Sequence, residues 1–398
     1  MNVSEMEPML IPDGDAGLDD LTFDLNRKAA GLSASLNPEV QQELGRLVRS
    51  MNCYYSNFLE GHQTHPRDIE RALNNEYAKD SKQRDLQLEA RAHIEVQEII
   101  DAGRDPQDAP PGSSAYVRWL HLEFCSRLPP EMLISRSERT GREVKVIPGE
   151  YRTDLVDVGA HVPPDPEDVP IFMKRFDEVY RPDRLSKPRQ LMSVATSHHR
   201  LAWIHPFADG NGRVARLMSH SMLKRLLVGN SLWSVSRGLA RNADRYKELL
   251  AAADRTKRNA LDGRGALSLE ELTRFSKFFL TVCIDQIDFM SQLLQPTEIL
   301  RRIGIYVTDE VVARRLPKGS FEMLRETYMR GSIARGEAKQ ITGYEERRAR
   351  ETIATLLDRG LLVSAGPRGP VSLGFPSDVL DRWLPGLYQM DAPSGPGA

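Results

Sequence analysis

Residues 205–216 read HPFADGNGRVAR, and this stretch decides the fold because it separates two segments with helical periodicity. The apolar residues at helical spacing are Leu191, Val194, Ala195, Leu201 and Ala202 before the stretch, and Val214, Leu217, Met218, Met222 and Leu226 after it. Pro206 and the two glycines of the stretch interrupt this pattern. The sequence therefore predicts a helix, a short loop and a second helix.

The loop carries residue types that suit a nucleotide site. Unpaired backbone N–H groups at the start of a helix bind anions, and glycines let a ligand approach the backbone closely. Arg213 and Arg216 lie three residues apart on one helix face and extend such a site to a polyphosphate. Asp209 offers hard oxygen ligands for Mg²⁺, and His205 can accept a proton near neutral pH. These residues predict a Mg-nucleotide site beside a general base.

The complete stretch resembles the signature of the Fic (filamentation induced by cAMP) family, His-x-Phe-x-Asp/Glu-Gly-Asn-Gly-Arg-x-x-Arg, at every specified position. The resemblance extends over about residues 37–294. It implies a protein adenylyltransferase that transfers AMP from ATP to a Ser, Thr or Tyr hydroxyl of a target protein, with auto-AMPylation as a further outcome. The expected fold class is mainly α: a Fic-type helical bundle with a small β-hairpin flap, plus a C-terminal winged helix-turn-helix domain.

The resemblance also implies a role for each residue of the stretch. These roles are His205 as general base, Asp209 as Mg²⁺ ligand, Gly210, Asn211 and Gly212 as donors to the α-phosphate, Arg213 on the β-phosphate and Arg216 on the γ-phosphate. In the branch of the family that transfers phosphate, a lysine stands at the position of Gly212. The glycine therefore favours transfer of AMP.

Residues 56–61, SNFLEG, resemble the inhibitory motif of the same family, Ser/Thr-x-x-x-Glu-Gly/Asn. Ser56, Glu60 and Gly61 occupy its fixed positions at the C-terminal end of a predicted helix. The resemblance implies that Glu60 pairs with Arg216 and keeps this arginine from the γ-phosphate. The plain alternative is an exposed glutamate in front of a helix-ending glycine.

Residues 149–164 are predicted to form a hairpin, and residues 136–149 a surface loop. Similar hairpins in Fic proteins form a flap over the nucleotide, and the flap binds the target's backbone by strand addition. This resemblance places Val158 and His161 at the nucleotide. Tyr246 aligns with a tyrosine that in the family often lines the adenine pocket, and the alternative of a core tyrosine stays open.

Five parts are predicted along the chain. They are an extended N-terminal arm (1–36), a helical region with the inhibitory helix (37–110), the catalytic core (111–296), a winged helix-like domain (297–385) and a flexible tail (386–398). Three predicted helices followed by a hairpin support the winged helix interpretation.

The third helix of this predicted domain carries Arg347, Arg348 and Arg350 where a recognition helix meets DNA. Glutamates on the same helix weaken the case for DNA. A protein-docking surface and a solvated face therefore stay open as alternatives.

Composition narrows the class of protein. The 398 residues are 40% hydrophobic and 28% charged with a formal net charge of −2, which excludes a globally basic nucleic-acid binder. Three widely spaced cysteines suit reduced thiols. The N-terminus is acidic and polar without a signal-peptide pattern, and no apolar run is long enough to span a bilayer. We expect a cytoplasmic protein that does not enter membranes.

Two other functions stay open. The same site could run in reverse as a deAMPylating hydrolase, with Glu60 positioning a water, as in some Fic proteins with this motif. The chain could also be a nucleotide-sensing DNA-binding regulator that acts through its C-terminal domain. A homodimer is a further open expectation.

Overall fold

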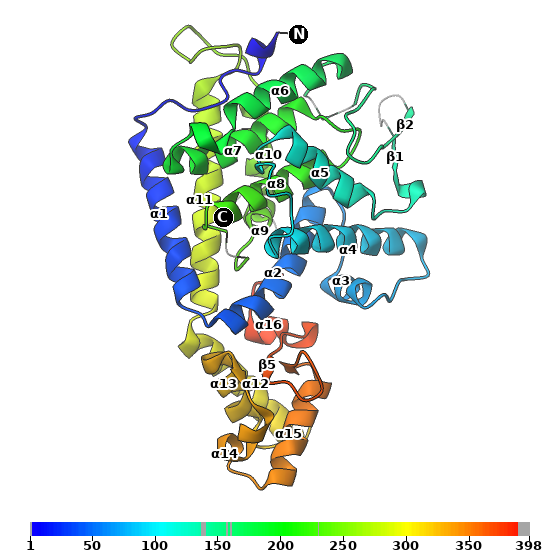
Figure 1. Ribbon diagram of the computed structural model, residues 1–398, viewed down its shortest axis with the longest axis vertical. Coiled ribbons are helices and arrows are strands. Elements are labelled where there is room, and N and C mark those ends of the chain that lie inside the picture. The colour runs from blue at the N-terminus through cyan, green and yellow to red at the C-terminus, as the bar shows by residue number, and fades with distance from the viewer. Residues whose placement is uncertain (1, 137–140, 157, 160, 230, 389–398) are drawn as a thin grey trace, which may run out of the picture. The chain divides into compact units, whose positions relative to one another are not determined.

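The computed structural model describes residues 2–136, 141–156, 158–159, 161–229 and 231–388. It is mainly helical with a small antiparallel hairpin, as the sequence predicts (Figure 1). The chain divides into two units, which we describe separately. Unit 1 comprises residues 1–29, 52–230 and 234–286, and unit 2 comprises residues 30–51, 231–233 and 287–398.

Most helices belong to unit 1. Those confined to it are α3 (Pro66–Leu73), α4 (Ser81–Asp101), α5 (Ser114–Cys125), α6 (Val169–Val179), α7 (Lys187–Ile204), α8 (Asn211–Arg225), α9 (Val235–Arg241) and α10 (Ala243–Ala252). Its short 3₁₀ helices are η1 (Val3–Glu5), η2 (Pro130–Met132), η3 (Pro166–Asp168) and η4 (Pro182–Arg184). Three helices continue from one unit into the other, namely α1 (Ala16–Ala34), α2 (Pro38–Leu59) and α11 (Leu269–Leu293).

Helices α7 and α8 form the centre of unit 1, joined by the loop that the sequence predicts. Val194, Leu201, Val214 and Leu217 are fully or almost fully buried, so the predicted apolar faces point into the core. Burial of such side chains contributes about 1.5–3 kcal/mol each. Helices α4 and α5 pack against each other and against α8 (Figure 1). The loop between α7 and α8 is therefore held at both ends by a packed helix pair.

The N-terminal residues differ from the predicted extended arm. Residues 16–34 form helix α1, and its residues Leu18 and Leu25 are completely buried. These leucines lie seven residues apart on one helix face. The prediction of an extended arm was wrong. The acidic residues between Leu18 and Leu25 make this segment look polar in the sequence, so the helical spacing of its apolar residues was missed.

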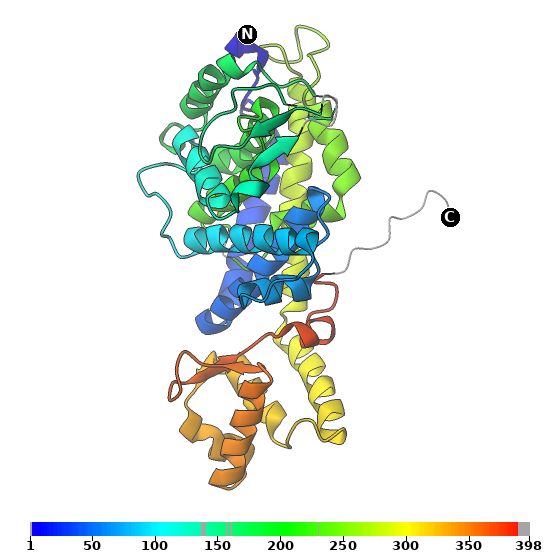
Figure 2. The same ribbon diagram turned by 90° about the vertical axis from the view of Figure 1, so that its right-hand side faces the viewer.

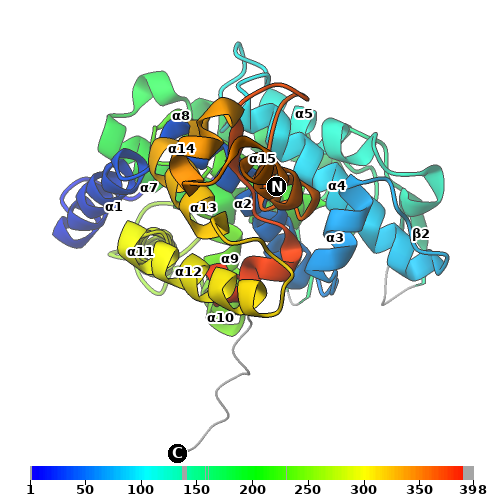
Figure 3. The same cartoon turned by 90° about the horizontal axis from the view of Figure 1, so that it is seen from below.

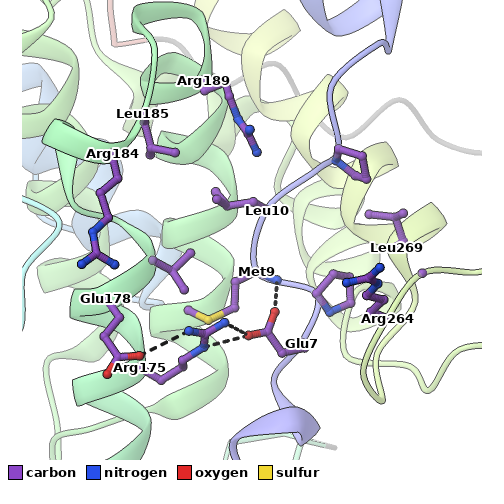
Figure 4. A pocket seen from close by; sticks show the side chains of 14 residues that line it. Glu7, Met9, Leu10, Arg175, Glu178, Arg184, Leu185, Arg189, Arg264 and Leu269 are labelled. Atoms are coloured by element: carbon purple, nitrogen blue, oxygen red, sulfur yellow. Dashed lines mark hydrogen bonds and ion pairs between the residues drawn. The ribbon is translucent and has the colours of Figure 1, made fainter.

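Residues 6–12 also lie against the core of unit 1, and Met6 and Met9 are buried. Figure 4 shows this segment between α6 and the residues before α11, with Glu7 paired to Arg175 at 2.6 Å. The Tyr180 hydroxyl donates to the Met9 carbonyl at 2.8 Å. Contacts with residues distant in sequence stabilise this segment, and local sequence patterns do not report them.

The hairpin lies earlier in the chain than predicted. Strands β1 (Ile134–Arg136) and β2 (Glu143–Lys145) form an antiparallel pair (Figure 2). In its register, Ile134 lies opposite Lys145. The predicted surface loop, residues 136–149, therefore begins at the last residue of β1 and contains β2. In residues 149–164, the described part contains one antiparallel bridge, between Val158 and His161. Prolines at 163 and 164 cannot donate backbone hydrogen bonds, which limits strand pairing there.

Unit 2 contains the three helices and two strands that the sequence predicts for its C-terminal part. Its elements are α12 (Pro296–Val312), α13 (Ser320–Arg330), β3 (Ser332–Ile333), η5 (Arg335–Glu337), α14 (Ala338–Thr342), α15 (Glu346–Asp358), β4 (Leu362–Val363), β5 (Val371–Leu373), η6 (Ser377–Val379) and α16 (Leu380–Trp383). Helices α13, α14 and α15 lie side by side (Figure 3). The two-residue strand β3 was not predicted, and it completes an antiparallel sheet of order β3-β5-β4.

Residues 386–388 of the predicted tail are described, and residues 389–398 lie outside the described part. Within the described residues, no helix combines the length and the apolar character needed to cross a membrane.

Candidate active site

His205 directly follows α7 and adopts a left-handed backbone conformation, with φ 49° and ψ 60°. Its N–H donates to the Leu201 carbonyl at 3.0 Å. Its Nδ1 lies 3.3 Å from the Ala202 carbonyl oxygen, which can only accept, so Nδ1 carries the proton. The lone pair is therefore on Nε2. Burial, together with the charge of Arg152, lowers the pKa of His205 to about 4, so the imidazole is neutral at pH 7.

The loop after His205 is held in shape by Asn211. Its Oδ1 accepts from the Phe207 N–H and its Nδ2 donates to the Phe207 carbonyl, both at 2.9 Å. Gly210 precedes α8 at φ 78°. Because the Asn211 amide is engaged within the loop, the donors left for a phosphate are the backbone N–H groups at the start of α8.

A cavity of about 680 Å³ lies over this loop, within unit 1. The predicted site residues that line it are Glu60, Val158, His161, His205, Asn211, Gly212, Arg216 and Tyr246. The structure thus brings most of the predicted site together around one space. Its volume suits a nucleotide-sized ligand, since ligand pockets typically measure about 300–1,000 Å³.

Glu60 and Arg216 form the predicted ion pair. Arg216 is 3% exposed, and its Nη2 donates to Glu60 Oε1. Its Nε donates to Ser56 Oγ at 2.8 Å, and its Nη2 also reaches the Ser56 carbonyl at 3.2 Å. Burial would raise the pKa of Glu60, but the charges of Arg216 and Arg213 outweigh it and hold the pKa at about 2. The pair is therefore ionised at neutral pH.

Two glycines fit this arrangement. Gly61 ends α2 with φ 82°, a conformation that glycine adopts readily, and its N–H donates to the Phe58 carbonyl at 3.0 Å. At Gly212, an added Cβ would overlap Glu60 Oε1 and would lie 3.1 Å from Arg216 Nη1. A lysine at position 212 is thus incompatible with this placement of Glu60.

Arg213 does not line the cavity. It is 4% exposed, and its Nη2 donates to Glu89 Oε2 at 2.9 Å. The same carboxylate oxygen lies 2.7 Å from His62 Nδ1. The guanidinium also stacks over the Phe124 ring, 5.4 Å from its centroid. In this structure the arginine predicted for the β-phosphate is thus held by a carboxylate of α4.

Tyr246 lines the cavity, and a hydrogen bond with His198 holds its hydroxyl in place. The hydroxyl lies 2.8 Å from His198 Nε2, and His198 Nδ1 lies 2.9 Å from Ser219 Oγ. Ser219 donates its own proton to the Ala215 carbonyl at 2.9 Å. This order makes His198 Nδ1 a donor and Nε2 the acceptor of the tyrosine proton. The ring of Tyr246 is therefore rigidly placed for contact with a flat apolar ligand group.

The remaining predicted residues lie at the edge of the site. His161 Nε2 donates to the Trp203 carbonyl at 2.7 Å, which ties the Val158–His161 bridge to the end of α7. Asp209 is exposed, and its Oδ1 accepts from the Gly210 N–H at 2.6 Å. No group of three potential metal ligands occurs among the described residues. A single exposed carboxylate suits Mg²⁺ that is held mainly by phosphates and water.

Sequence reasoning missed three residues beside the site. They are His62 and Glu89, which contact Arg213, and Arg152, which donates to the His205 carbonyl at 2.8 Å. These contacts join residues that are far apart in the chain. A single sequence carries no local signal for them.

Comparison with known proteins identifies the central region. A model of the Fic/DOC family matches residues 113–223. The protein adenylyltransferase Fic of Drosophila virilis is 43% identical over 77 residues, which are 19% of this chain and 16% of that protein. The corresponding protein of Drosophila melanogaster is 40% identical over 77 residues. The match thus spans about a sixth of the length of these curated relatives, 16% in both cases.

Solved structures share the fold. A Fic family protein from Desulfovibrio desulfuricans G20 superposes with a TM-score of 0.52 at 15% identity, covering 92% of this chain and 98% of that chain. A fragment of Fic-1 from C. elegans superposes with a TM-score of 0.50 at 13% identity, covering 68% of this chain and 71% of that one. These similarities establish the fold.

Proposed function

The chain contains a Fic/DOC family domain at residues 113–223, and from this premise we propose that it is a protein adenylyltransferase acting on a hydroxyl side chain of a target protein. One observation supports this proposal most strongly. A single cavity is lined by His205, the start of α8 and Arg216. A general base, an anion-binding helix start and a phosphate-binding arginine are the parts that transfer from a nucleoside triphosphate requires.

The reaction follows from these positions. The target hydroxyl attacks the α-phosphorus of ATP, and its proton passes to Nε2 of His205. A bond forms between the hydroxyl oxygen and the α-phosphorus, and the bond from that phosphorus to the bridging oxygen breaks. Pyrophosphate leaves, and AMP stays on the target. Backbone N–H groups at the start of α8 stabilise the charge that develops on the α-phosphate oxygens.

The rest of the cavity orients the triphosphate. Arg216 binds the γ-phosphate once Glu60 has moved away, and Tyr246 contacts the adenine. Asp209 would hold Mg²⁺, and the bound ion would neutralise phosphate charge. Glu60 pairs with Arg216, the arginine that we assign to the γ-phosphate, and we infer that this pairing inhibits the enzyme. The target backbone docks beside the segment that carries Val158 and His161.

Labelled ATP tests this proposal directly. We expect the Glu60→Gly protein to transfer label from α-labelled ATP to itself or to a lysate protein, and to transfer none from γ-labelled ATP. Mass spectrometry of the modified peptide should show the mass of one AMP on a Ser, Thr or Tyr side chain. Transfer of the γ label would instead identify a kinase and would contradict the proposal.

The pH dependence gives a second expected outcome. Because the pKa of His205 is lowered to about 4, the base is deprotonated above that pH and protonated below it. We expect kcat/KM of the Glu60→Gly protein to rise through about pH 4 and to show no loss from imidazole protonation between pH 5 and 8. An acid limb with its midpoint near pH 6.5 would show that the imidazole is solvated like a free histidine.

The C-terminal part of unit 2, from α12 to α16, is better suited to docking a protein than to binding DNA. The order of its elements from α13 to β5 supports its assignment as a winged helix. On α15, Arg347 pairs with Glu351 at 3.1 Å, and Arg350 pairs with Glu346. Arg348 stacks over Tyr344, 4.2 Å from the ring centroid. Carboxylates beside these arginines repel DNA phosphates, so we infer that this unit contacts a protein partner.

A further inference from the structure

Arg152 is a buried cation beside the candidate base. It is 4% exposed, and its Nε donates to the His205 carbonyl at 2.8 Å. Its Nη1 donates to the Asp154 carbonyl at 3.2 Å and its Nη2 to the Pro164 carbonyl. Among the described residues, none of its hydrogen bonds goes to a carboxylate. Three backbone carbonyls, together with the charge of Asp165, therefore stabilise this buried cation.

The three carbonyls come from two parts of the site. Asp154 and Pro164 are the two ends of the 154–164 segment, which lines the cavity through Val158 and His161. The described residues of this segment form a single bridge and no strand ladder. The Arg152 side chain thus connects both ends of the 154–164 segment to His205. The Arg152 N–H adds a bond to the Pro206 carbonyl at 2.9 Å.

The bond to the His205 carbonyl acts on a strained residue. A left-handed backbone is strained for a non-glycine residue, so the surrounding contacts must hold it. Leu201 accepts from the His205 N–H on one side, and Arg152 donates to its carbonyl on the other. These bonds fix the peptide planes on both sides of the histidine and so fix the direction of its side chain.

We propose that Arg152 is a positioning residue for AMP transfer, which couples the placement of the 154–164 segment to the orientation of the His205 imidazole. This inference rests on the proposed function. A general stabilising role is the competing explanation. It predicts a loss of stability without a specific loss in the chemical step.

Arg200 provides a matched control. It is also fully buried, and its Nε and Nη2 donate to the Pro8 carbonyl at 3.1 and 2.6 Å. It does not line the cavity. Arg152→Gln and Arg200→Gln therefore remove similar buried cations from the same unit, and each removes bonds to backbone carbonyls.

Both substitutions are to be made in the Glu60→Gly protein. Misplacement by about 1 Å can slow an enzymatic step by about 10²-fold. We expect Arg152→Gln to lower kcat by about 10- to 100-fold with the KM for ATP changed less than about threefold. Arg200→Gln should leave kcat unchanged.

The pH profile gives a second readout. In Arg152→Gln, loss of the positive charge near His205 should move the acid limb of kcat/KM to higher pH. Arg152→Lys keeps the charge, so it should keep that limb in place and recover kcat in part.

Each result decides the inference. Equal kcat values for Arg152→Gln and Arg200→Gln would overturn it, whether both are normal or both are reduced. Should Arg152→Gln fail to fold, a normal kcat in Arg152→Lys would overturn it and a reduced kcat would support it.

Hydrogen exchange separates this inference from the proposed function. We expect peptides covering residues 154–164 and 201–206 to exchange faster in Arg152→Gln than in Arg200→Gln. Unchanged exchange would contradict the coupling. If the Glu60→Gly parent transferred no AMP, the proposed function would fail, and the exchange data would still decide whether Arg152 links the two regions.

Discussion

Replacing His205 with alanine in the Glu60→Gly protein is expected to slow AMP transfer by about 10²–10⁴-fold, the usual contribution of a general base. The hydroxyl proton must leave as the oxygen attacks, and the alanine variant has no group at this position to take it. The Nδ1 contact with Ala202 leaves Nε2 as the accepting nitrogen. Initial rates with α-labelled ATP measure this effect.

ATP binding and folding should survive the same substitution, because we expect the phosphates to contact α8 and Arg216. Calorimetry should therefore give a dissociation constant for ATP within about threefold of the parent value. His220→Gln is a suitable control, since His220 lies on α8 and pairs with Asp101 at 2.8 Å without lining the cavity. A His205→Ala protein that keeps more than a tenth of the parent rate would refute the base assignment.

Replacing Glu60 with glycine is expected to raise AMP transfer by about 10- to 100-fold over the wild-type protein. Hydrogen bonds to charged groups contribute about 1.5–3 kcal/mol, and each 1.4 kcal/mol corresponds to a factor of ten. Removing the carboxylate frees Arg216 for the γ-phosphate. The Ser56 contacts remain, at 2.8 and 3.2 Å, so the guanidinium keeps two of its hydrogen bonds when its carboxylate partner is removed. Rates at saturating ATP measure the gain.

A Glu60→Gln variant serves as the control for this result. The amide keeps the size of the side chain and weakens its attraction for Arg216, so an intermediate rate is expected. Slower AMP transfer by Glu60→Gly than by wild type would contradict inhibition. Loss of AMP removal from a modified protein in the same variant would instead support the hydrolase alternative, in which the Glu60 carboxylate activates water.

The signature loop could be predicted because its residues are neighbours in the chain. The helix break at Pro206 and the stripes of Val194 and Leu217 are local, and the structure confirms both helices. The pairing of Glu60 with Arg216 crosses 156 positions of sequence, and only the family resemblance suggested it. The structure contains that pair as well.

Other features could not be predicted, and each has a physical cause. The direction of Arg213 depends on Glu89, which approaches it from α4. Strands β1 and β2 have three residues each and one apolar residue each, Ile134 and Val144, so they are too short to show the apolar alternation typical of strands. Helix α1 and the segment before it owe their placement to buried contacts such as the Tyr180–Met9 hydrogen bond. Sequence periodicity reports local structure and misses contacts of this kind.

A crystal structure of the Glu60→Gly protein with Mg²⁺ and a non-hydrolysable ATP analogue would show where and in which direction the nucleotide binds. We expect the triphosphate across the start of α8, the γ-phosphate on Arg216 and the α-phosphorus on the side of His205 Nε2. A nucleotide bound in the reverse direction, or a triphosphate outside the cavity lined by His205, would contradict this expectation.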